Sequence, residues 1–98
     1  MRYARNVHFQ INTGKEQEFT GVFEKEVLPM LRKQNGFVEE MTLVNPKGAY
    51  AISLWDDRKS ADAYQASTYP QVLAKLTTVI EGTPTIETYE SASTYARN

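Results

Sequence analysis

A single stretch near the middle of the chain, residues 54–64, constrains the fold more than any other. A strand-forming apolar run ends on Trp55, the only tryptophan, and an alanine-bearing, helix-forming run follows almost at once. In the strand, residues 50, 52 and 54 share one apolar face, and the opposite face, which includes Ser53, is small until it reaches Trp55. Asp57 or Ser60 is expected to cap the helix, because either side chain can accept a hydrogen bond from a free backbone N–H. We therefore expect a fold in which strand and helix alternate.

The N-terminal part predicts a strand followed by a helix. Apolar residues at 7, 9 and 11 alternate with polar ones, which is the period of a strand with one buried face. Thr13 and Glu16 have the spacing of a capping box, so a helix should begin near Lys15. Its apolar residues recur at helical spacing up to position 31. Pro29 interrupts this pattern and is expected to kink the helix rather than divide it, because proline removes one backbone hydrogen bond.

The middle of the chain predicts a β-hairpin. Asn35 and Gly36 should end the helix, since both tolerate positive φ. A strand is expected over residues 37–44, with Phe37, Met41 and Leu43 on one side. A turn over residues 45–48 then leads into the strand over residues 49–55.

The C-terminal part predicts a divided helix and a last strand. Tyr69–Pro70 should break the helix into pieces over about residues 58–67 and 70–80, because the residue before a proline avoids the α region. Gly82 is expected to close the second piece. A β-rich segment from 85 to 95 completes the order βαββαβ.

Composition limits what such a chain can do. We expect one domain spanning residues 1–98, and a domain of this size buries only about 60 to 65% of its unfolded surface, so dimerisation would stabilise it. With 11 Lys and Arg against 12 Asp and Glu, there is no basic excess for nucleic acid. The chain has no cysteine and a single histidine, so no metal site is expected. No signal-like or membrane-spanning segment is found, and a cytoplasmic protein is expected.

The segments Gly36–Val38, Leu54–Trp55 and Ser60–Ala61, together with Gly82, resemble the antibiotic biosynthesis monooxygenase-like domains of the dimeric α+β barrel superfamily. The resemblance covers nearly the whole chain. It implies a ferredoxin-like α+β sandwich, in which helices cover one face of a four-stranded antiparallel sheet and a second subunit covers the other. Such domains include cofactor-free oxygenases, haem degraders and small-molecule isomerases, so the resemblance does not by itself name a reaction.

Aromatic residues supply the main site candidates. Trp55 can form a cavity wall and donate one hydrogen bond, with Ser53 among the small residues that leave room for a ligand; the alternative is a core aromatic. Tyr64 and Tyr69 stand where many quinol-oxidising members of the resembling family carry histidine. Under a catalytic interpretation they position substrate oxygens, since a phenol donates a hydrogen bond at neutral pH but is a poor base; otherwise they are surface or interface tyrosines. Three phenylalanines would exclude water from the substrate, namely Phe9, Phe23 and Phe37.

Polar residues of the first strand are weaker candidates. Asn6 can bind substrate through its amide, whereas His8 alternates with the apolar residues and is expected on the polar face of the sheet, in a structural role. Haem degraders of the resembling family carry a first-strand asparagine and a histidine iron ligand. Val7 stands at that asparagine position unless the strand contains a bulge, and the ligand position falls near Ala74, where there is no histidine. Haem degradation is therefore disfavoured.

The leading hypothesis is a small-molecule oxidoreductase similar to cofactor-independent monooxygenases that act on phenolic or quinol-like aromatics. No cofactor is expected, because the electron-rich anion of such a substrate reacts with oxygen itself. The alternative is a noncatalytic homodimeric module that binds a small ligand or is associated with stress, so enzymatic activity stays open. Haem binding without degradation is a third possibility. An RNA-recognition module is excluded because Ala49, Ala51 and Leu54 stand where its third strand needs aromatic residues.

Overall fold

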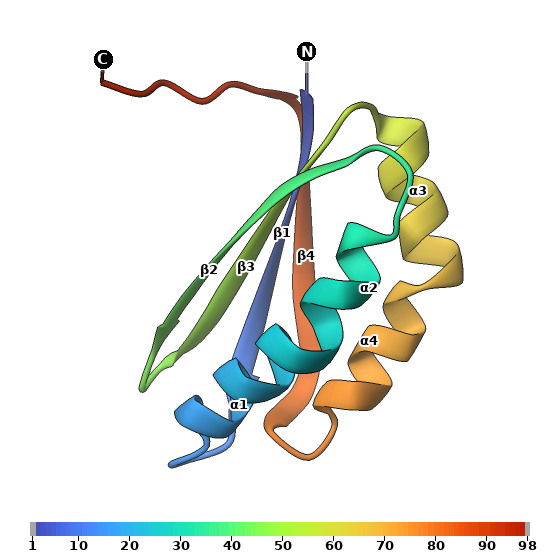
Figure 1. Ribbon diagram of the computed structural model, residues 1–98. Helices are drawn as coiled ribbons and strands as arrows, with labels where there is room; N and C mark the ends of the chain where they lie inside the picture. The colour runs from blue at the N-terminus through green and yellow to red at the C-terminus, as the bar shows by residue number, and fades with distance from the viewer. Residues whose placement is uncertain (1, 98) are drawn as a thin grey trace.

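The computed structural model describes residues 2–97, which form a four-stranded antiparallel sheet with helices on one face (Figure 1). The strands lie in the order β2-β3-β1-β4, which confirms the expected ferredoxin-like βαββαβ arrangement. In chain order the elements are β1 (Arg2–Ile11), α1 (Glu16–Val22), the π-helical turn η1 (Phe23–Val27), α2 (Leu28–Arg32), β2 (Phe37–Asn45), β3 (Gly48–Trp55), α3 (Arg58–Ser67), α4 (Tyr69–Leu76) and β4 (Ile80–Ala92).

The core lies between the sheet and the helices. The alternation predicted for the first strand is confirmed: Val7 and Phe9 of β1 are buried, and they pair with Ala51 and Ala49 of β3. The small β3 side chains leave room for larger residues from the helices. The largest fully buried side chains within residues 2–97 are Trp55, Phe9, Phe19, Leu76, Val27, Val72 and Val79.

The first helical segment runs from Glu16 to Arg32 as α1, η1 and α2. Pro29 lies in the first turn of α2, so it does not divide the helix, as predicted. The π-helical turn that precedes it was not indicated by the sequence; wider turns of this kind relieve a helix whose regular hydrogen-bond ladder is interrupted. The predicted capping box is wrong. Lys15 is the N-cap and no side chain caps the helix; its N–H instead donates to the Asn12 carbonyl at 2.9 Å in a turn.

A bulge at the start of β2 changes which of its residues face the helices. Phe37 pairs with Trp55 and Glu39 pairs with Leu54, so the register shifts by one residue at Val38. Phe37 therefore shares the helix-covered face with Trp55, whereas Met41 lies on the opposite face. The prediction that Phe37 and Met41 lie on one side is wrong, because a bulge inserts one residue without an opposite partner.

The C-terminal half agrees with the predictions up to α4. Asp57 caps α3 by accepting a hydrogen bond from the Ser60 N–H at 2.8 Å, and a break before Pro70 separates α3 from α4. The prediction for Gly82 is wrong: α4 ends at Leu76 and β4 already begins at Ile80. Gly82 instead lies inside β4 with φ of 69°, where the pairing with β1 is irregular.

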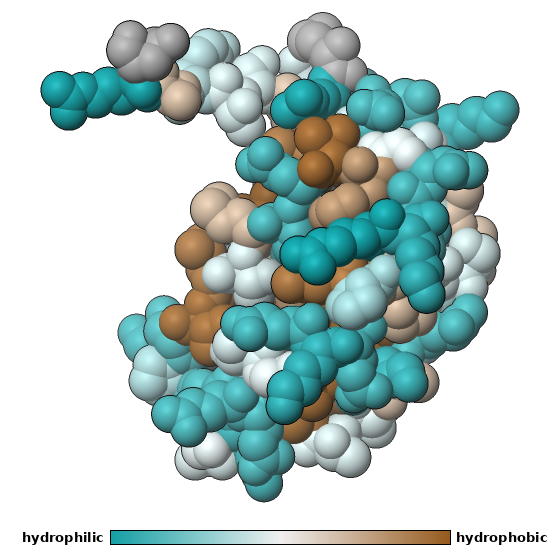
Figure 2. All heavy atoms as spheres, in the orientation of Figure 1, coloured by the Kyte–Doolittle hydropathy of each residue, from teal (hydrophilic) through white to brown (hydrophobic). Residues whose placement is uncertain are grey.

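The face of the sheet away from the helices carries exposed apolar side chains. His8 lies on this face, as predicted, and stacks on Tyr50 with ring centroids 4.5 Å apart. Figure 2 shows hydrophobic atoms along this side of the molecule, at the left of the view. The large exposed residues on this open face are Met41, Leu43, Tyr50 and Tyr89. Within residues 2–97, no helix is long and apolar enough to cross a membrane.

Candidate functional site

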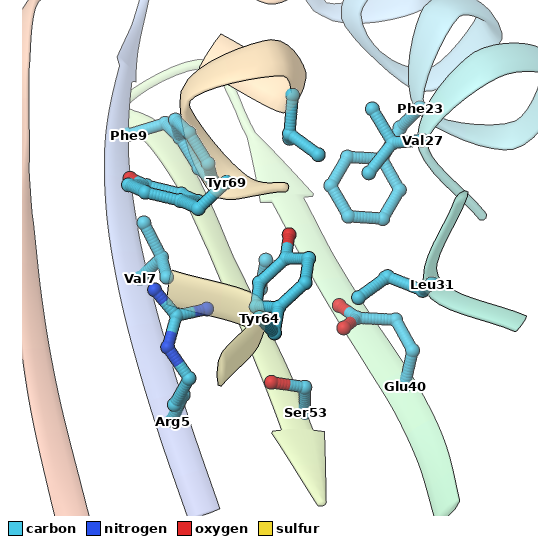
Figure 3. Close-up of a pocket in the computed structure, with 12 residues that line it drawn as sticks. Arg5, Val7, Phe9, Phe23, Val27, Leu31, Glu40, Ser53, Tyr64 and Tyr69 are labelled. Carbon is cyan, nitrogen blue, oxygen red and sulfur yellow. The ribbon is translucent and has the colours of Figure 1, made fainter. Parts of the chain in front are cut away.

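A small cavity lies between the helices and the sheet, and two charged residues enter it. Its volume is about 20 Å³, which is room for a single water molecule. Figure 3 shows the guanidinium of Arg5 and the carboxylate of Glu40 pointing into it from β1 and β2, on either side of Tyr64 in this view. The remaining wall is mostly apolar and aromatic, comprising Val7, Phe9, Phe23, Val27, Leu31, Ala51, Ser53, Tyr64, Tyr69 and Val72.

Arg5 is a buried cation, with only 3% of its surface exposed. Its Nη2 donates a hydrogen bond to Oε1 of Gln65 on α3. The guanidinium lies over two rings, 5.0 Å from the centroid of Tyr64 and 4.8 Å from that of Tyr69. Burial lowers the pKa of Arg5 from its usual value, but arginine stays protonated in proteins. The cavity therefore contains a fixed positive charge.

Glu40 is partly buried and faces the same cavity because of the β2 bulge. One carboxylate oxygen, Oε2, accepts a hydrogen bond from Oγ1 of Thr42 at 3.0 Å. Burial raises the pKa of Glu40 to about 8, although Thr42 and the charge of Arg5 both act to lower it. None of the ion pairs formed within residues 2–97 joins Glu40 to Arg5. Glu40 is therefore poised to gain or lose a proton near neutral pH.

Tyr64 and Tyr69 form the helix-side wall. Their rings lie 6.2 Å apart, centroid to centroid. Burial raises the pKa of Tyr64 to about 12 and also raises that of Tyr69, while Arg5 acts to lower both. Both hydroxyls are therefore neutral donors at pH 7. The Tyr69 Oη is buried and has no hydrogen-bond partner within the described part of the chain.

Trp55 and Phe37 lie behind this wall rather than in it. Trp55 is fully buried, its ring centroid is 5.1 Å from that of Tyr64, and its Nε1 donates to Oγ of Ser53 at 2.9 Å. Phe37 meets the indole edge-on at 5.6 Å. The indole N–H is thus already used, and Trp55 acts on the cavity by supporting Tyr64.

The structure therefore brings together most, but not all, of the residues singled out from the sequence. Five of them line the cavity, namely Phe9, Phe23, Ser53, Tyr64 and Tyr69. Asn6 is on the other face of the sheet, opposite Ile52 of β3, and its buried Oδ1 has no partner within residues 2–97. It is separated from the cavity by the sheet itself.

Sequence reasoning missed both charged residues. Arg5 could have been found, because it lies two residues before Val7 in the same alternation and so belongs on the buried face. Glu40 gave a conflicting signal. Strict alternation from Phe37 places residue 40 on the opposite face, whereas the register of the hairpin places it opposite Ser53, and the bulge at Val38 is what allows both Phe37 and Glu40 to face the helices.

A second, larger hollow adjoins the cavity on its outer side. It has a volume of about 370 Å³ and lies between η1 and the edge strand β2. Phe23 and Glu40 line both spaces. The other residues that line the hollow are Thr20, Glu24, Leu28, Thr42 and Val44.

These groups suit an aromatic ligand that carries an acidic proton. Aromatic walls bind flat rings, Arg5 stabilises a negative oxygen, and Glu40 can exchange a proton near pH 8. Within residues 2–97, no three histidine, aspartate or glutamate side chains are grouped closely enough to hold a metal ion.

Comparison with models of known protein families gave no match, and comparison with curated proteins gave none either. Solved structures do match. A protein of unknown function from Nitrosomonas europaea, NE2512, superimposes with a TM-score of 0.80 at 18% identity, over 99% of this chain and 95% of that one. SnoaB, a cofactor-independent oxygenase from Streptomyces nogalater, gives 0.78 at 17% identity, over 98% of both chains.

A third neighbour is a monooxygenase from ActVA-Orf6 of Streptomyces coelicolor, solved in complex with the ligand nanaomycin D. It gives a TM-score of 0.78 at 11% identity, over 98% of this chain and 92% of that one. Antibiotic biosynthesis monooxygenase-like proteins are thus among the structural neighbours, which is the resemblance predicted from the sequence. At these identities the likeness establishes the fold.

Proposed function

We propose that the protein is a cofactor-independent oxygenase that acts on phenolic or quinol-like aromatic molecules. The observation that carries this proposal is the pair of charged groups in one aromatic cavity: a buried Arg5, which forms no ion pair within residues 2–97, and a Glu40 whose pKa is raised to about 8. The shared fold with SnoaB supports it, since that neighbour is a cofactor-independent oxygenase.

In the proposed reaction, ionised Glu40 takes the acidic proton of the substrate and Arg5 stabilises the resulting anion. A carboxylate with a pKa near 8 is a better match to a phenol than an ordinary glutamate is. The anion then reduces oxygen. In the overall change, a ring CH2 or an aromatic C–H para to the hydroxyl becomes a carbonyl; the substrate gives four electrons to O2, one oxygen atom enters the product and the other leaves as water.

The remaining cavity residues position the substrate and keep water out. Tyr69, whose hydroxyl has no partner within residues 2–97, binds a substrate oxygen, and Tyr64 holds the acidic end of the substrate between Arg5 and Glu40. Phe9 and Phe23 exclude water from the anion. Trp55 and Phe37 act from behind Tyr64, and Ser53 fixes the indole of Trp55. Asn6, on the other face of the sheet, takes no part in this chemistry.

Oxygen uptake tests the proposal. The purified protein is mixed with hydroquinones, anthrone-like polyphenols and catechols, and heat-denatured protein corrects for spontaneous oxidation. Glu40→Gln should abolish the protein-dependent uptake, because the amide cannot accept the proton. Glu39→Gln makes the same change on the neighbouring, exposed residue and should leave uptake unchanged. Equal uptake by wild type and Glu40→Gln would refute the proposed role of Glu40.

A noncatalytic, ligand-binding function is the second candidate. The observation that favours it is the size of the inner cavity, about 20 Å³, which has room for a water but for no aromatic ring. A protein that binds aromatic molecules and consumes no oxygen across the panel would support this alternative.

We also propose that the protein is a homodimer. The open face of the sheet exposes Met41, Leu43, Tyr50 and Tyr89, and burying these side chains against a second copy would remove them from water. Light scattering at micromolar concentration tests this, and a mass of one chain would refute it.

A further inference from the structure

We propose that the hollow between η1 and β2 binds the ring system of a planar aromatic anion, whose negative oxygen reaches Arg5 when Phe23 swings aside. Phe23 is then the gate between the two spaces and selects the ligand. This inference rests on the proposed function, because it assigns the substrate class and the entry route of that same site.

The charge of the cavity points to an anion. Arg5 is almost fully buried, its Nη2 donates to the neutral amide of Gln65, and its guanidinium lies over the faces of two tyrosine rings. Glu40 faces the same cavity and acts on Arg5 electrostatically, but none of the ion pairs within residues 2–97 joins the two side chains. A buried cation without a paired anion is unfavourable, so a ligand that brings a negative oxygen is preferred over a neutral one.

The two spaces differ in what they can hold. The inner cavity of about 20 Å³ accommodates a charged oxygen only after a small movement of Phe23, whereas the hollow has a volume of about 370 Å³, which is within the range of small-molecule sites. Phe23, Leu28 and Val44 give the hollow its apolar wall, and Thr20 and Thr42 give it hydroxyl groups. The ring system therefore fits outside and the charged end inside.

Charge at the mouth orients the ligand. Glu24, an exposed residue, also lines the hollow. Its carboxylate repels the negative end of the ligand from the outer rim, while Arg5 attracts it from within. An aromatic anion would therefore enter with its charged end first.

The position of Phe23 suits a gate. It lines both spaces, and it is the first residue of the π-helical turn, a type of turn that often occurs at functional sites. Its ring stacks on Phe19 at 5.8 Å, and Figure 3 shows it beside Val27 at the helix side of the cavity. The strand next to it, β2, is the edge of the sheet, so the route to solvent passes through no backbone hydrogen bonds of the sheet.

Calorimetry with two matched probes tests the charge requirement without any turnover. The probes are 2-naphthoate and its neutral amide, 2-naphthamide, which share the same ring system. The wild type should bind naphthoate about tenfold or more tightly than the amide, the difference expected of a charge-assisted hydrogen bond. Arg5→Gln should remove this preference and Arg5→Lys should retain it. Equal binding of the two probes by the wild type would overturn the proposal.

Association kinetics test the gate. Stopped-flow quenching of Trp fluorescence follows the rate of naphthoate association. The association rate constant should rise several-fold in Phe23→Ala and fall in Phe23→Trp. It should also rise in Glu24→Gln and stay unchanged in Glu39→Gln. If both Phe23 variants bind naphthoate at the wild-type rate, Phe23 is not a gate. If naphthoate binding depends on Arg5 and Phe23 but none of the phenolic compounds of the uptake panel is oxidised, the proposed oxygenase is refuted and this inference stands.

Discussion

Replacing Glu40 by glutamine should remove a pH dependence of folding that the wild type carries. Burial raises the pKa of this carboxyl from 4.5 to about 8 in the folded protein. Between these values the folded state binds more protons than the unfolded state, so the stability contributed by neutral Glu40 is present at low pH and is lost as the pH rises through about 8. Glutamine resembles the neutral acid and does not titrate, so the variant should lack this loss.

The magnitude follows from the two pKa values. With 4.5 for the unfolded and about 8 for the folded chain, ionisation of Glu40 lowers the free energy of unfolding by roughly 3 kcal/mol between about pH 5.5 and 8.5. At pH 5.5 Glu40→Gln should already be about 1 kcal/mol more stable than the wild type, because the unfolded wild-type chain has an ionised Glu40 there. At the higher pH this advantage of Glu40→Gln should be larger by roughly 3 kcal/mol.

Urea denaturation at these two pH values measures the effect, with the protein concentration held fixed so that self-association contributes equally. Glu39→Gln is the matched control, because it makes the same change on the adjacent exposed residue and should keep the pH dependence of the wild type. A pH dependence in Glu40→Gln equal to that of the wild type would show that Glu40 is not buried as the structure places it.

Four further predictions use the same structure. Tyr69→Phe removes a buried hydroxyl that has no partner within residues 2–97, so stability measured in urea should stay within about 1 kcal/mol of the wild type, and a larger loss would show that the hydroxyl is hydrogen-bonded in solution. Asp57→Ala removes the cap of α3 and should lower the urea midpoint at neutral pH; because the cap lowers the pKa of Asp57, this loss should shrink as the pH falls below about 4, and a loss that does not change with pH would argue against a charged cap. Gly36→Ala should lower the free energy of unfolding by about 2 kcal/mol or more, because φ is 80° there and a Cβ would overlap Ser60. A melting temperature equal to that of the wild type would contradict the backbone conformation at Gly36. If Glu40 is the base, kcat/KM for oxygen uptake should rise as the pH passes through about 8, and a profile flat from pH 6 to 9 would exclude that role.

The sequence predicted the fold well because local signals and the global arrangement agree. Period-two alternation in β1 and β3, the hairpin turn before Gly48 and the break at Pro70 each specify one backbone geometry, and the structure contains all of them. The predictions failed where two local solutions compete. Thr13 has the spacing of a capping box, but a turn closed by the Asn12 carbonyl begins the helix, and Gly82 suits a helix end as well as an irregular strand.

The candidate site was predicted only in its aromatic half. The spacing of aromatic residues predicts that they lie on a buried face, as it does for Phe9 and Tyr64. A charged residue is predicted to be buried only if the inward and outward alternation of its strand is extended to include it. Continuing the alternation of β1 back from Val7 places Arg5 inside, and the structure confirms that placement at 3% exposure. For Glu40 the two extrapolations disagree: alternation followed forward from Phe37 places it on the open face, whereas alternation followed back from the hairpin places it opposite Ser53, on the helix-covered face.

The bulge at Val38 is therefore the feature on which the proposed site depends. Phe37 and Glu40 are three residues apart, so in a regular strand they would point to opposite faces of the sheet. The extra residue lets both face the helices: Phe37 meets Trp55, which supports Tyr64, while Glu40 pairs with Ser53 and enters the cavity beside that tyrosine. A strand without the bulge could keep either the aromatic support or the carboxylate on the helix side, but not both. The irregular pairing at the start of β2 thus brings a group that can exchange a proton near pH 8 into the same cavity as the buried charge of Arg5.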